Sequence, residues 1–393
     1  MDDARTDWLC VAALIACIGV FGLALGLTYP LLSLMMAEAG MSDFMIGLNG
    51  AMTGVGLVLS TFFLPGAIRL FGAFRILVAG LVIAAGGMLL FPVSDPTTHW
   101  YPLRIVLGAA LNAIFVISEA WLNSVTAEHI RGRVIGVYAT VMAAGFALGP
   151  LLLVALGGAG LAPFLVGAAI VGGSVLAMLP LRGREAPGLR GMDLAALARF
   201  LRVGALLTGV VLVFAFYDAA VMTLLPVYML RSGFSADIGA AALSALMLGM
   251  VAAQYPVGWL LDRFPRPGVI VGCGLVAAAS CALLPLSLGH DWLLWPVLVI
   301  QGGASFALYT GALTVLGERF RGSLLLAGSA CFAFVYGIGG GAGPLAGGST
   351  LQGLGPDAMM LLFAAVFLAL AVAVLRLPLT QAQDKGAAVT ETT

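Results

Sequence analysis

The chain has 393 residues, of which 62% are hydrophobic and only 9% are charged. A soluble domain carries about 25% charged residues, so this composition excludes a soluble enzyme or binding module and indicates an integral membrane protein. The formal net charge is zero, and charge balance therefore predicts no nucleic-acid partner.

Twelve apolar segments, separated by clusters of charge, glycine and proline, are the predicted membrane spans. A spanning helix needs about 20 apolar residues, and each segment approaches or exceeds that length. Residues 1–7 carry three acids and one arginine, the wrong charge for a signal peptide, so we expect no cleavable leader. In chain order the predicted spans cover residues 8–30, 44–64, 74–93, 100–124, 133–157, 160–181, 203–230, 237–261, 268–289, 291–316, 324–347 and 357–378.

The basic residues are distributed unevenly between the two sides of these spans. With both termini placed in the cytoplasm, sixteen of the eighteen lie on the cytoplasmic side, and only Arg104 and Arg231 lie toward the outside. Such an excess is typical of cytoplasmic loops. We therefore predict a multi-pass protein of the bacterial inner (cytoplasmic) membrane, with both termini in the cytoplasm.

The longest polar segment between spans, residues 182–202, contains five arginines. Within it Leu194, Leu197, Ala198 and Leu201 recur at helical spacing. This pattern is compatible with a short helix on the inner membrane surface or with a solvated linker.

The second half of the chain repeats features of the first. Residues 39–48 (AGMSDFMIGL) match residues 232–241 (SGFSADIGAA) at an offset of 193, and two later turns match at offsets of 193 and 190. Ordered matches at nearly one offset indicate an internal repeat of about half the chain. We therefore predict an all-α integral membrane protein with two pseudo-symmetric six-helix bundles. The predicted parts are a first bundle at 1–181, a cytoplasmic linker with its surface helix at 182–202, a second bundle at 203–378 and a disordered cytoplasmic tail at 379–393.

The loop after the second span of each half carries a recognisable motif. In the second half it reads Gly258-x-x-x-Asp262-Arg263-x-x-Arg266; in the first half Arg69 stands where the aspartate is expected. This motif, with the repeat, resembles the major facilitator superfamily (MFS) over essentially the full length of the chain. In that family such charges are thought to latch the cytoplasmic gate through ion pairs and helix-end dipoles; the alternative is that they only set the topology. The expected gate residues are Asp262, Arg263, Arg266, Glu128, Arg131 and Arg69.

Two further elements are similar to family patterns. Arg104-x-x-x-Gly108 resembles an element whose arginine is associated with proton transfer in the family. The glycine–proline pattern of family antiporters occurs in full in the eleventh span and in a shorter form in the fifth. It implies closely packed, bent helices, and the full pattern favours export over import. Its residues are Gly145, Gly149 and Pro150 in the fifth span and Gly339, Gly343 and Pro344 in the eleventh.

No motif for an enzyme, a metal or a cofactor has its required context. Residues 337–342 fit the dinucleotide pattern G-x-G-x-x-A, but they lie in an apolar span rather than at a strand-to-helix turn. The five cysteines lie in apolar runs without metal-ligand spacing. We therefore expect no catalytic residue, no metal site, no cofactor and no enzymatic activity.

The fourth span carries a polar stripe. Arg104, Gly108, Asn112, Phe115 and Glu119 fall within an arc of about 80°, which predicts that this face points to a central cavity. Arg104 would otherwise anchor the helix at the outer interface. Glu119 would otherwise pair with Arg131 or Arg133 at the cytoplasmic rim.

Asp218 has no other charge in its predicted span, 203–230, and lies near its middle. A carboxylate in hydrocarbon costs roughly 2.5–3.5 kcal/mol on insertion scales, so an acid here indicates a translocation site. Burial favours the neutral acid until a path opens, as a proton site requires; an interhelical hydrogen bond is the alternative. The predicted proton-coupling residues are Asp218, Glu119 and Arg104. The predicted substrate-binding residues are Asn112, Phe115, Gln301, Tyr309, Tyr29, Asn49, Tyr217, Gln254 and Tyr336.

Three functions remain open. The first is proton-coupled export, by alternating access, of small amphipathic drugs or metabolites, since the predicted cavity has few fixed charges. The second is proton-coupled import of a sugar, amino acid or organic acid on the same scaffold. The third is a sensor or assembly factor that transports nothing. In the first two, the expected partners are a small-molecule substrate, protons and the lipid bilayer, and the protein is expected to act as a monomer.

Overall fold

The structure is a computed structural model that describes residues 7–127, 130–158, 160–184, 194–377 and 379. Twelve of its helices, or pairs of consecutive helices, are long and apolar enough to cross a membrane, and no strand occurs in these residues. The predicted all-α fold with twelve spans is therefore confirmed. The predicted tail, except Leu379, lies outside the described residues.

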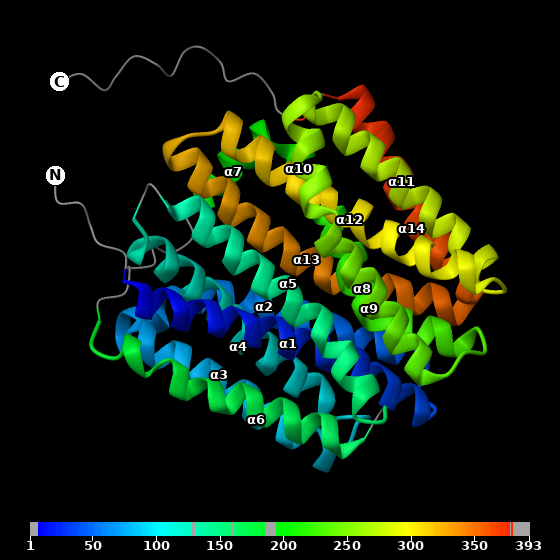
Figure 1. Cartoon of the computed structure of the whole chain (residues 1–393), viewed down its shortest axis with the longest axis horizontal. Helices are drawn as coiled ribbons and strands as arrows, with labels where there is room; N and C mark the ends of the chain where they lie inside the picture. The colour runs from blue at the N-terminus through cyan, green and yellow to red at the C-terminus, as the bar shows by residue number, and fades with distance from the viewer. Residues whose placement is uncertain (1–6, 128–129, 159, 185–193, 378, 380–393) are drawn as a thin grey trace.

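The helices follow one another in two sets (Figure 1). The first set is α1 (Trp8–Glu38), α2 (Asp43–Phe71), α3 (Ala73–Leu90), the 3-10 turn η1 (Phe91–Val93), α4 (Trp100–Val125), α5 (Arg131–Ala155), α6 (Leu161–Ala177) and the 3-10 turn η3 (Leu179–Leu181). The second set is α7 (Leu194–Val203), α8 (Ala205–Arg231), α9 (Ala236–Ala252), α10 (Gln254–Arg263), α11 (Arg266–Ser287), α12 (Asp291–Arg319), α13 (Gly322–Leu354) and α14 (Pro356–Arg376).

The repeat noted in the sequence corresponds to two equivalent helix starts. The side chain of Ser42 accepts a hydrogen bond from the backbone N–H of Met45 at the start of α2, and Ser235 accepts one from Ile238 at the start of α9. A serine in this position satisfies an N–H that has no partner within the helix. The matching serines therefore start the second span of each half.

Prolines account for the main differences from the predicted spans. The first span was predicted to end at Pro30, but α1 continues through it to Glu38, and residues 31–34 are buried. The predicted span 237–261 is found as one span, Ala236–Arg263, but its helix is interrupted at Ala253 into α9 and α10. Pro256 has no N–H for the carbonyl of Ala252, and its ring would collide with that carbonyl, so the helix stops there and restarts.

The two sets form two halves that meet along two lines of contact. Helix α2 packs along α13, and α5 packs along α9, whereas α3 and α6 form one outer edge and α11 and α14 the other (Figure 1). The ends of the spans differ in charge. We call the end with Arg69, Arg75, Arg182, Arg266 and Arg319 the arginine-rich end, and the end with Asp43, Arg231, Asp237, Asp291 and Asp357 the opposite end.

The segment between the halves contains the helix α7. Its Phe200 is fully buried, with ring centroids 5.0 Å from Phe320 and 6.1 Å from Phe332. These contacts dock α7 on the second half, at the arginine-rich end.

Candidate functional site

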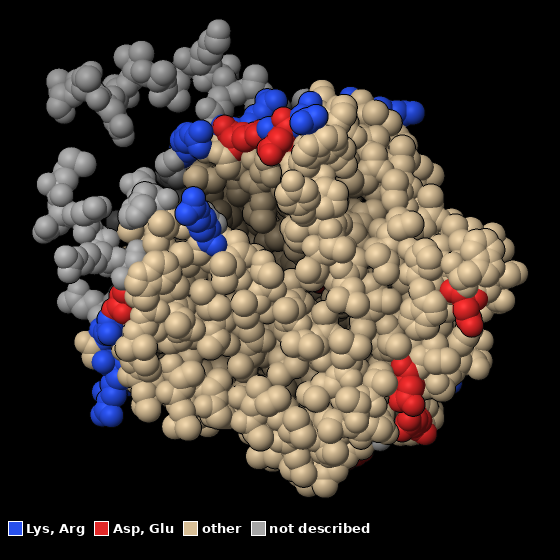
Figure 2. Space-filling view, in the orientation of Figure 1, with Lys and Arg blue, Asp and Glu red and all other residues tan. Residues whose placement is uncertain are grey.

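The space between the halves is closed at the opposite end and open at the arginine-rich end. At the opposite end α2 and α13 meet without intervening side chains, because a Cβ on Gly47 would collide with the carbonyl of Pro344 and one on Gly54 with the backbone of Gly341. Figure 2 shows a hollow between the halves, which opens toward the arginine-rich end. A molecule in this hollow would therefore have access to one side of the membrane only.

One ion pair joins the halves at the opposite end. Arg231, at the end of α8, lies with Nη2 2.9 Å from Asp43 Oδ1 at the start of α2. Nearby, the backbone N–H of Phe44 donates to Gln352 Oε1 of α13 over 3.0 Å. This pair was not predicted from the sequence. The feature that could have indicated it is Arg231, one of only two basic residues assigned to the outside.

We expect Arg231→Gln to loosen this closure. Thr223, which is buried against Gly50 of α2, becomes accessible only if α2 and α8 separate. A Thr223→Cys reporter should react up to about fivefold faster with a membrane-impermeant maleimide, corresponding to ~1 kcal/mol for a partly exposed ion pair. Cys273→Ser removes the native thiol that is not fully buried.

The matched control exchanges the two charges. Asp43→Arg combined with Arg231→Asp should restore slow labelling, because the ion pair is remade in reverse. Equal rates in the wild type and in Arg231→Gln would show that the pair does not hold this end closed.

Asp218 lies in the middle of the 27-residue helix α8 and is 6% exposed. Its Oδ2 accepts a hydrogen bond of 2.6 Å from the hydroxyl of Tyr336 on α13. No basic side chain lies within ion-pairing distance of Asp218 in the described part of the chain. Burial disfavours the charged carboxylate, and the single hydrogen bond from Tyr336 offsets only part of that cost.

Arg104 is 1% exposed, so it does not extend to the membrane surface as an interfacial anchor would. Its guanidinium lies 4.4 Å from the ring centroid of Tyr29, and its Nη1 donates to the carbonyl oxygen of Thr28 over 3.3 Å. Its Nε has no hydrogen-bond partner among the described residues. Arg104 is thus a buried cation stabilised by an aromatic face and one carbonyl.

Tyr29 connects this cation to the acid of the other half. It lies within electrostatic range of both Arg104 and Asp218, and Tyr336 lies within range of Tyr29. Helices α1, α4, α8 and α13 therefore bring four predicted site residues together. Two are predicted coupling residues, Arg104 and Asp218, and two are predicted binding residues, Tyr29 and Tyr336.

Glu119 lies further toward the arginine-rich end of α4. It is exposed although its helix is among the most buried, and it lies within electrostatic range of Tyr138 and of Tyr309 in the other half. Its carboxylate forms no ion pair with Arg133 in the described part of the chain. For Arg131, the other suggested partner, the structure describes only the backbone.

Aromatic rings form a cluster between the two acids. The ring centroid of Phe214 lies 5.3 Å from Tyr309, 5.5 Å from Phe306 and 6.2 Å from Tyr336. Tyr309 and Tyr336 were predicted binding residues, but Phe214 and Phe306 were not. The sequence spacing could have predicted Phe214, because it precedes Asp218 by four residues and so lies on the same face of α8.

The polar stripe of α4 does not face one cavity. Gly108 packs against the backbone of Thr53, and Asn112 Nδ2 donates to Ser60 Oγ over 2.7 Å, so this part of the stripe faces α2. The ring of Phe115 lies 5.5 Å from Phe21 of α1. Since neighbouring helices also occupy this arc, the prediction that the whole stripe lines the cavity is wrong, and Asn112 is used within the first half.

Three predicted binding residues are buried, and two of them have partners inside the second half. The ring of Tyr217 lies 4.8 Å from Phe367 of α14, and Gln301 Nε2 donates to Cys281 Sγ of α11 over 3.2 Å. Asn49 is 2% exposed on α2, and its Nδ2 has no partner among the described residues. Gln254, another predicted binding residue, is exposed at the break between α9 and α10.

The predicted gate charges are mostly used within one half. Arg266 Nη2 lies 2.7 Å from Glu318 Oε1, and Arg263 lies 4.7 Å from the ring centroid of Trp259; all four residues belong to the second half. Asp262 is exposed and forms no ion pair with the first half in the described residues. Glu128 lies outside the described residues, and Arg69 lines a pocket described below.

The glycine–proline elements pack helices closely. Gly145 and Gly149 of α5 lie against the backbone of α1 at Gly19 and Gly26. In α13, Gly339 and Gly343 lie against the backbone of α8, whereas Pro344, one residue further, contacts Gly47 of α2. One row of small residues on α13 therefore packs against α8 within the second half, and another row packs against α2 of the first half.

Twelve spans in two halves, with a closed end, an open end and buried charges between them, define a secondary transporter. The sequence profile of the Major Facilitator Superfamily matches residues 14–247 and 236–392, and the chain belongs to this family. It is therefore a membrane transporter, not an enzyme. Among the described residues, no three His, Cys, Asp or Glu side chains gather to hold a metal ion.

Relatives and solved structures agree with this assignment. The chain is 25% identical over 347 residues to the uncharacterized MFS-type transporter YfkF of Bacillus subtilis, covering 86% of this chain and 88% of the relative. It is 25% identical to YcaD of Salmonella typhimurium over 356 residues, covering 88% and 89%. A structure of the nucleoside transporter NupG superposes with a TM-score of 0.75 at 14% identity, covering 94% of this chain and 99% of that one. The fucose:proton symporter FucP of E. coli gives 0.62 at 17% identity, covering 94% and 99%.

Proposed function

We propose that this protein is a proton-coupled exporter of small amphipathic molecules, and that Asp218 is the proton site. The observation that carries the proposal is a mid-membrane carboxyl that has one hydrogen bond, from Tyr336, and no cationic partner. A carboxyl in this position is stable while protonated and requires water, substrate or a cation when it is ionised.

The proposed cycle exchanges one proton for one substrate molecule. In the state open to the cytoplasm, Asp218 releases its proton, and substrate binds between the aromatic cluster and the carboxylate. The halves then rock about this site, a proton from the outside displaces the substrate, and the protonated site returns. For a neutral substrate each proton supplies about 2.3 kcal/mol per 100 mV of membrane potential, in addition to the pH gradient. For a monovalent cation the one-for-one exchange moves no net charge, so the pH gradient alone drives it.

The aromatic cluster favours an organic cation or a neutral aromatic compound as substrate. Phe214, Phe306, Tyr309 and Tyr336 offer ring faces, and Glu119 of the first half is an exposed acid. Aromatic faces attract cations, and the carboxylate adds to that attraction. Arg104 is buried against Tyr29 and is therefore poorly placed to bind a carboxylate substrate.

Import is the second candidate, because one of the solved structures with this fold is a symporter. Those similar in fold include a nucleoside transporter and a fucose:proton symporter. The fold is shared, but these similarities of 14% and 17% identity give no residue-level support for either substrate.

Proteoliposomes that contain a pH-sensitive dye test these alternatives. We expect tetraphenylphosphonium to drive proton movement in the direction opposite to its own, with uridine and L-fucose inactive. Proton movement in the same direction as uridine or L-fucose would contradict the proposed export and support import. No proton flux with any of these probes or with a wider compound panel would favour a sensor or assembly factor.

Glu119→Gln separates attraction from coupling in the same assay. We expect weaker binding of the cation, seen as a KM raised several-fold, with the number of protons exchanged per cation unchanged. A loss of coupling with an unchanged KM would make Glu119 the proton site in place of Asp218.

A further inference from the structure

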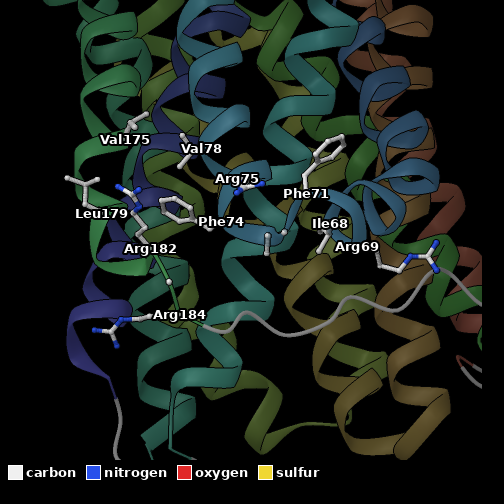
Figure 3. Close-up of a pocket in the computed structure, with 13 residues that line it drawn as sticks. Ile68, Arg69, Phe71, Phe74, Arg75, Val78, Val175, Leu179, Arg182 and Arg184 are labelled. Atoms are coloured by element: carbon white, nitrogen blue, oxygen red, sulfur yellow. The ribbon is translucent and has the colours of Figure 1, made fainter.

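A pocket at the arginine-rich end of the first half lies outside the transport path. It has a volume of about 900 Å³ and lies where the end of α2, the start of α3, the end of α6 and η3 come together (Figure 3). The turn between α2 and α3 is made by Gly72, whose positive φ of 84° lets one helix end and the next begin without a linker. That sharp turn brings Arg69 and Arg75 to the same pocket.

Among the described residues, the pocket is lined by four arginines and no acid. Arg184 is already used, because it forms an ion pair with Asp7 and its Nε donates to the carbonyl of Pro180 over 2.8 Å. The side chains of Arg69, Arg75 and Arg182 form no ion pair or hydrogen bond in the described part of the chain. Their three charges are therefore available to an anion.

The rest of the lining is apolar, and part of it is exposed on the surface of the spans. Phe71 is 58% exposed and Leu179 is 54% exposed, and Phe74, Val78 and Val175 line the same pocket. Helices α3 and α6 form an outer edge of the molecule (Figure 1), and a bilayer around the spans would meet this edge. The pocket thus offers cations and hydrocarbon contacts at one site, as an amphiphile requires.

We propose that this pocket binds an anionic phospholipid of the surrounding leaflet. Guanidinium groups bind phosphate with paired, charge-assisted hydrogen bonds. Figure 3 shows Arg75 and Arg182 on either side of Phe74, with Arg69 at one edge of the pocket and Arg184 at another. The phosphate binds to Arg75 and Arg182 at the mouth of the pocket, and the acyl chains follow the exposed apolar side chains of α3 and α6.

The position of the pocket in the membrane supports this occupant over a free anion. The arginine-rich end is the predicted cytoplasmic end, and basic pockets between spans at that depth meet lipid headgroups directly. Inorganic phosphate would use the arginines but would leave Phe71 and Leu179 exposed. A zwitterionic lipid would cover those side chains but would leave the three charges without a counterion.

Binding of fluorescent phosphatidylglycerol to the purified full-length protein tests the proposal. Each arginine near a headgroup contributes about fivefold to affinity, so the double variant Arg75→Gln/Arg182→Gln should bind about 30-fold more weakly at low salt. The matched control is Arg202→Gln/Arg376→Gln, which removes two exposed arginines from the same end but outside the pocket. It should bind as the wild type does.

Three outcomes would overturn the proposal. Phosphatidylcholine bound as tightly as phosphatidylglycerol would show a purely apolar groove. Inorganic phosphate that displaces the lipid at equal concentration would show a site for free anions. Equal losses in the two double variants would show a general effect of surface charge.

A measurement on the wild-type chain covers the case in which the pocket variant does not fold. Photoactivatable phosphatidylglycerol, after illumination and proteolysis, should label peptides that contain residues 68–78 and 175–184. Labelling spread evenly over the lipid-facing helices, including α11 and α14, would contradict a defined site.

Discussion

Asp218→Asn is expected to abolish proton-coupled transport, reducing substrate-driven proton flux to the background of protein-free liposomes. The side-chain amide keeps an oxygen that can accept the 2.6 Å hydrogen bond from Tyr336, so the local packing is retained. It cannot gain and lose a proton at physiological pH. Flux is measured with an internal pH dye, and folding by size-exclusion profile and thermal denaturation.

A counterflow assay distinguishes loss of coupling from loss of transport. Exchange of labelled for unlabelled substrate needs no net proton movement, and we expect it to continue in Asp218→Asn. The matched control is Asp291→Asn, an exposed acid at the opposite end, which should leave both assays unchanged. Normal proton flux in Asp218→Asn would move the coupling site to another group.

Gly343→Ala should produce the largest loss of stability. A single Cβ at this position would collide with the carbonyl oxygen of Phe216 in α8, and a backbone oxygen cannot move aside as a side chain can. Overpacking of this kind typically costs about 1–3 kcal/mol, and the rigid contact places this site at the upper end. Because Phe216 is two residues from Asp218, the displaced α8 should also impair transport.

Gly353→Ala in the same helix is the matched control. A Cβ at Gly353 would meet no atom within 4 Å. Replacing glycine by alanine within a helix stabilises it by up to about 1 kcal/mol, so the two variants should differ in sign. Thermal denaturation in detergent measures both, and a Gly343→Ala protein as stable as the wild type would contradict the close packing of α13 on α8.

The fold followed from the sequence because its main determinants are local. Apolar length marks a span, arginine marks one side of the membrane, and Ser42 and Ser235 mark equivalent helix starts. Proline effects were less predictable, since Pro30 lies inside α1 whereas Pro256 interrupts a span. The difference lies in the surrounding packing, which a single sequence does not contain.

The candidate site was predictable only in part. Helical spacing places Arg104, Asn112 and Glu119 on one side of α4, but it does not say which neighbour fills each part of that arc. Asn112 proves to bond to α2, and Arg104 stacks on Tyr29 of α1. The pair of Asp43 with Arg231 spans 188 residues and needs three-dimensional information.

The glycine-lined contact between α2 and α13 has a mechanical consequence. Where Gly47 and Gly54 meet Pro344 and Gly341, the two helices touch through backbone rather than through interlocking side chains. Because few side chains interlock at this contact, few rotamers need to change before the two helices slide or separate. The contact is also uncharged, so neither salt nor protons weaken it. The two helices can therefore slide or separate at this contact with little rearrangement. Among the described residues, the Asp43–Arg231 pair is the only ion pair that holds the two halves together at this end.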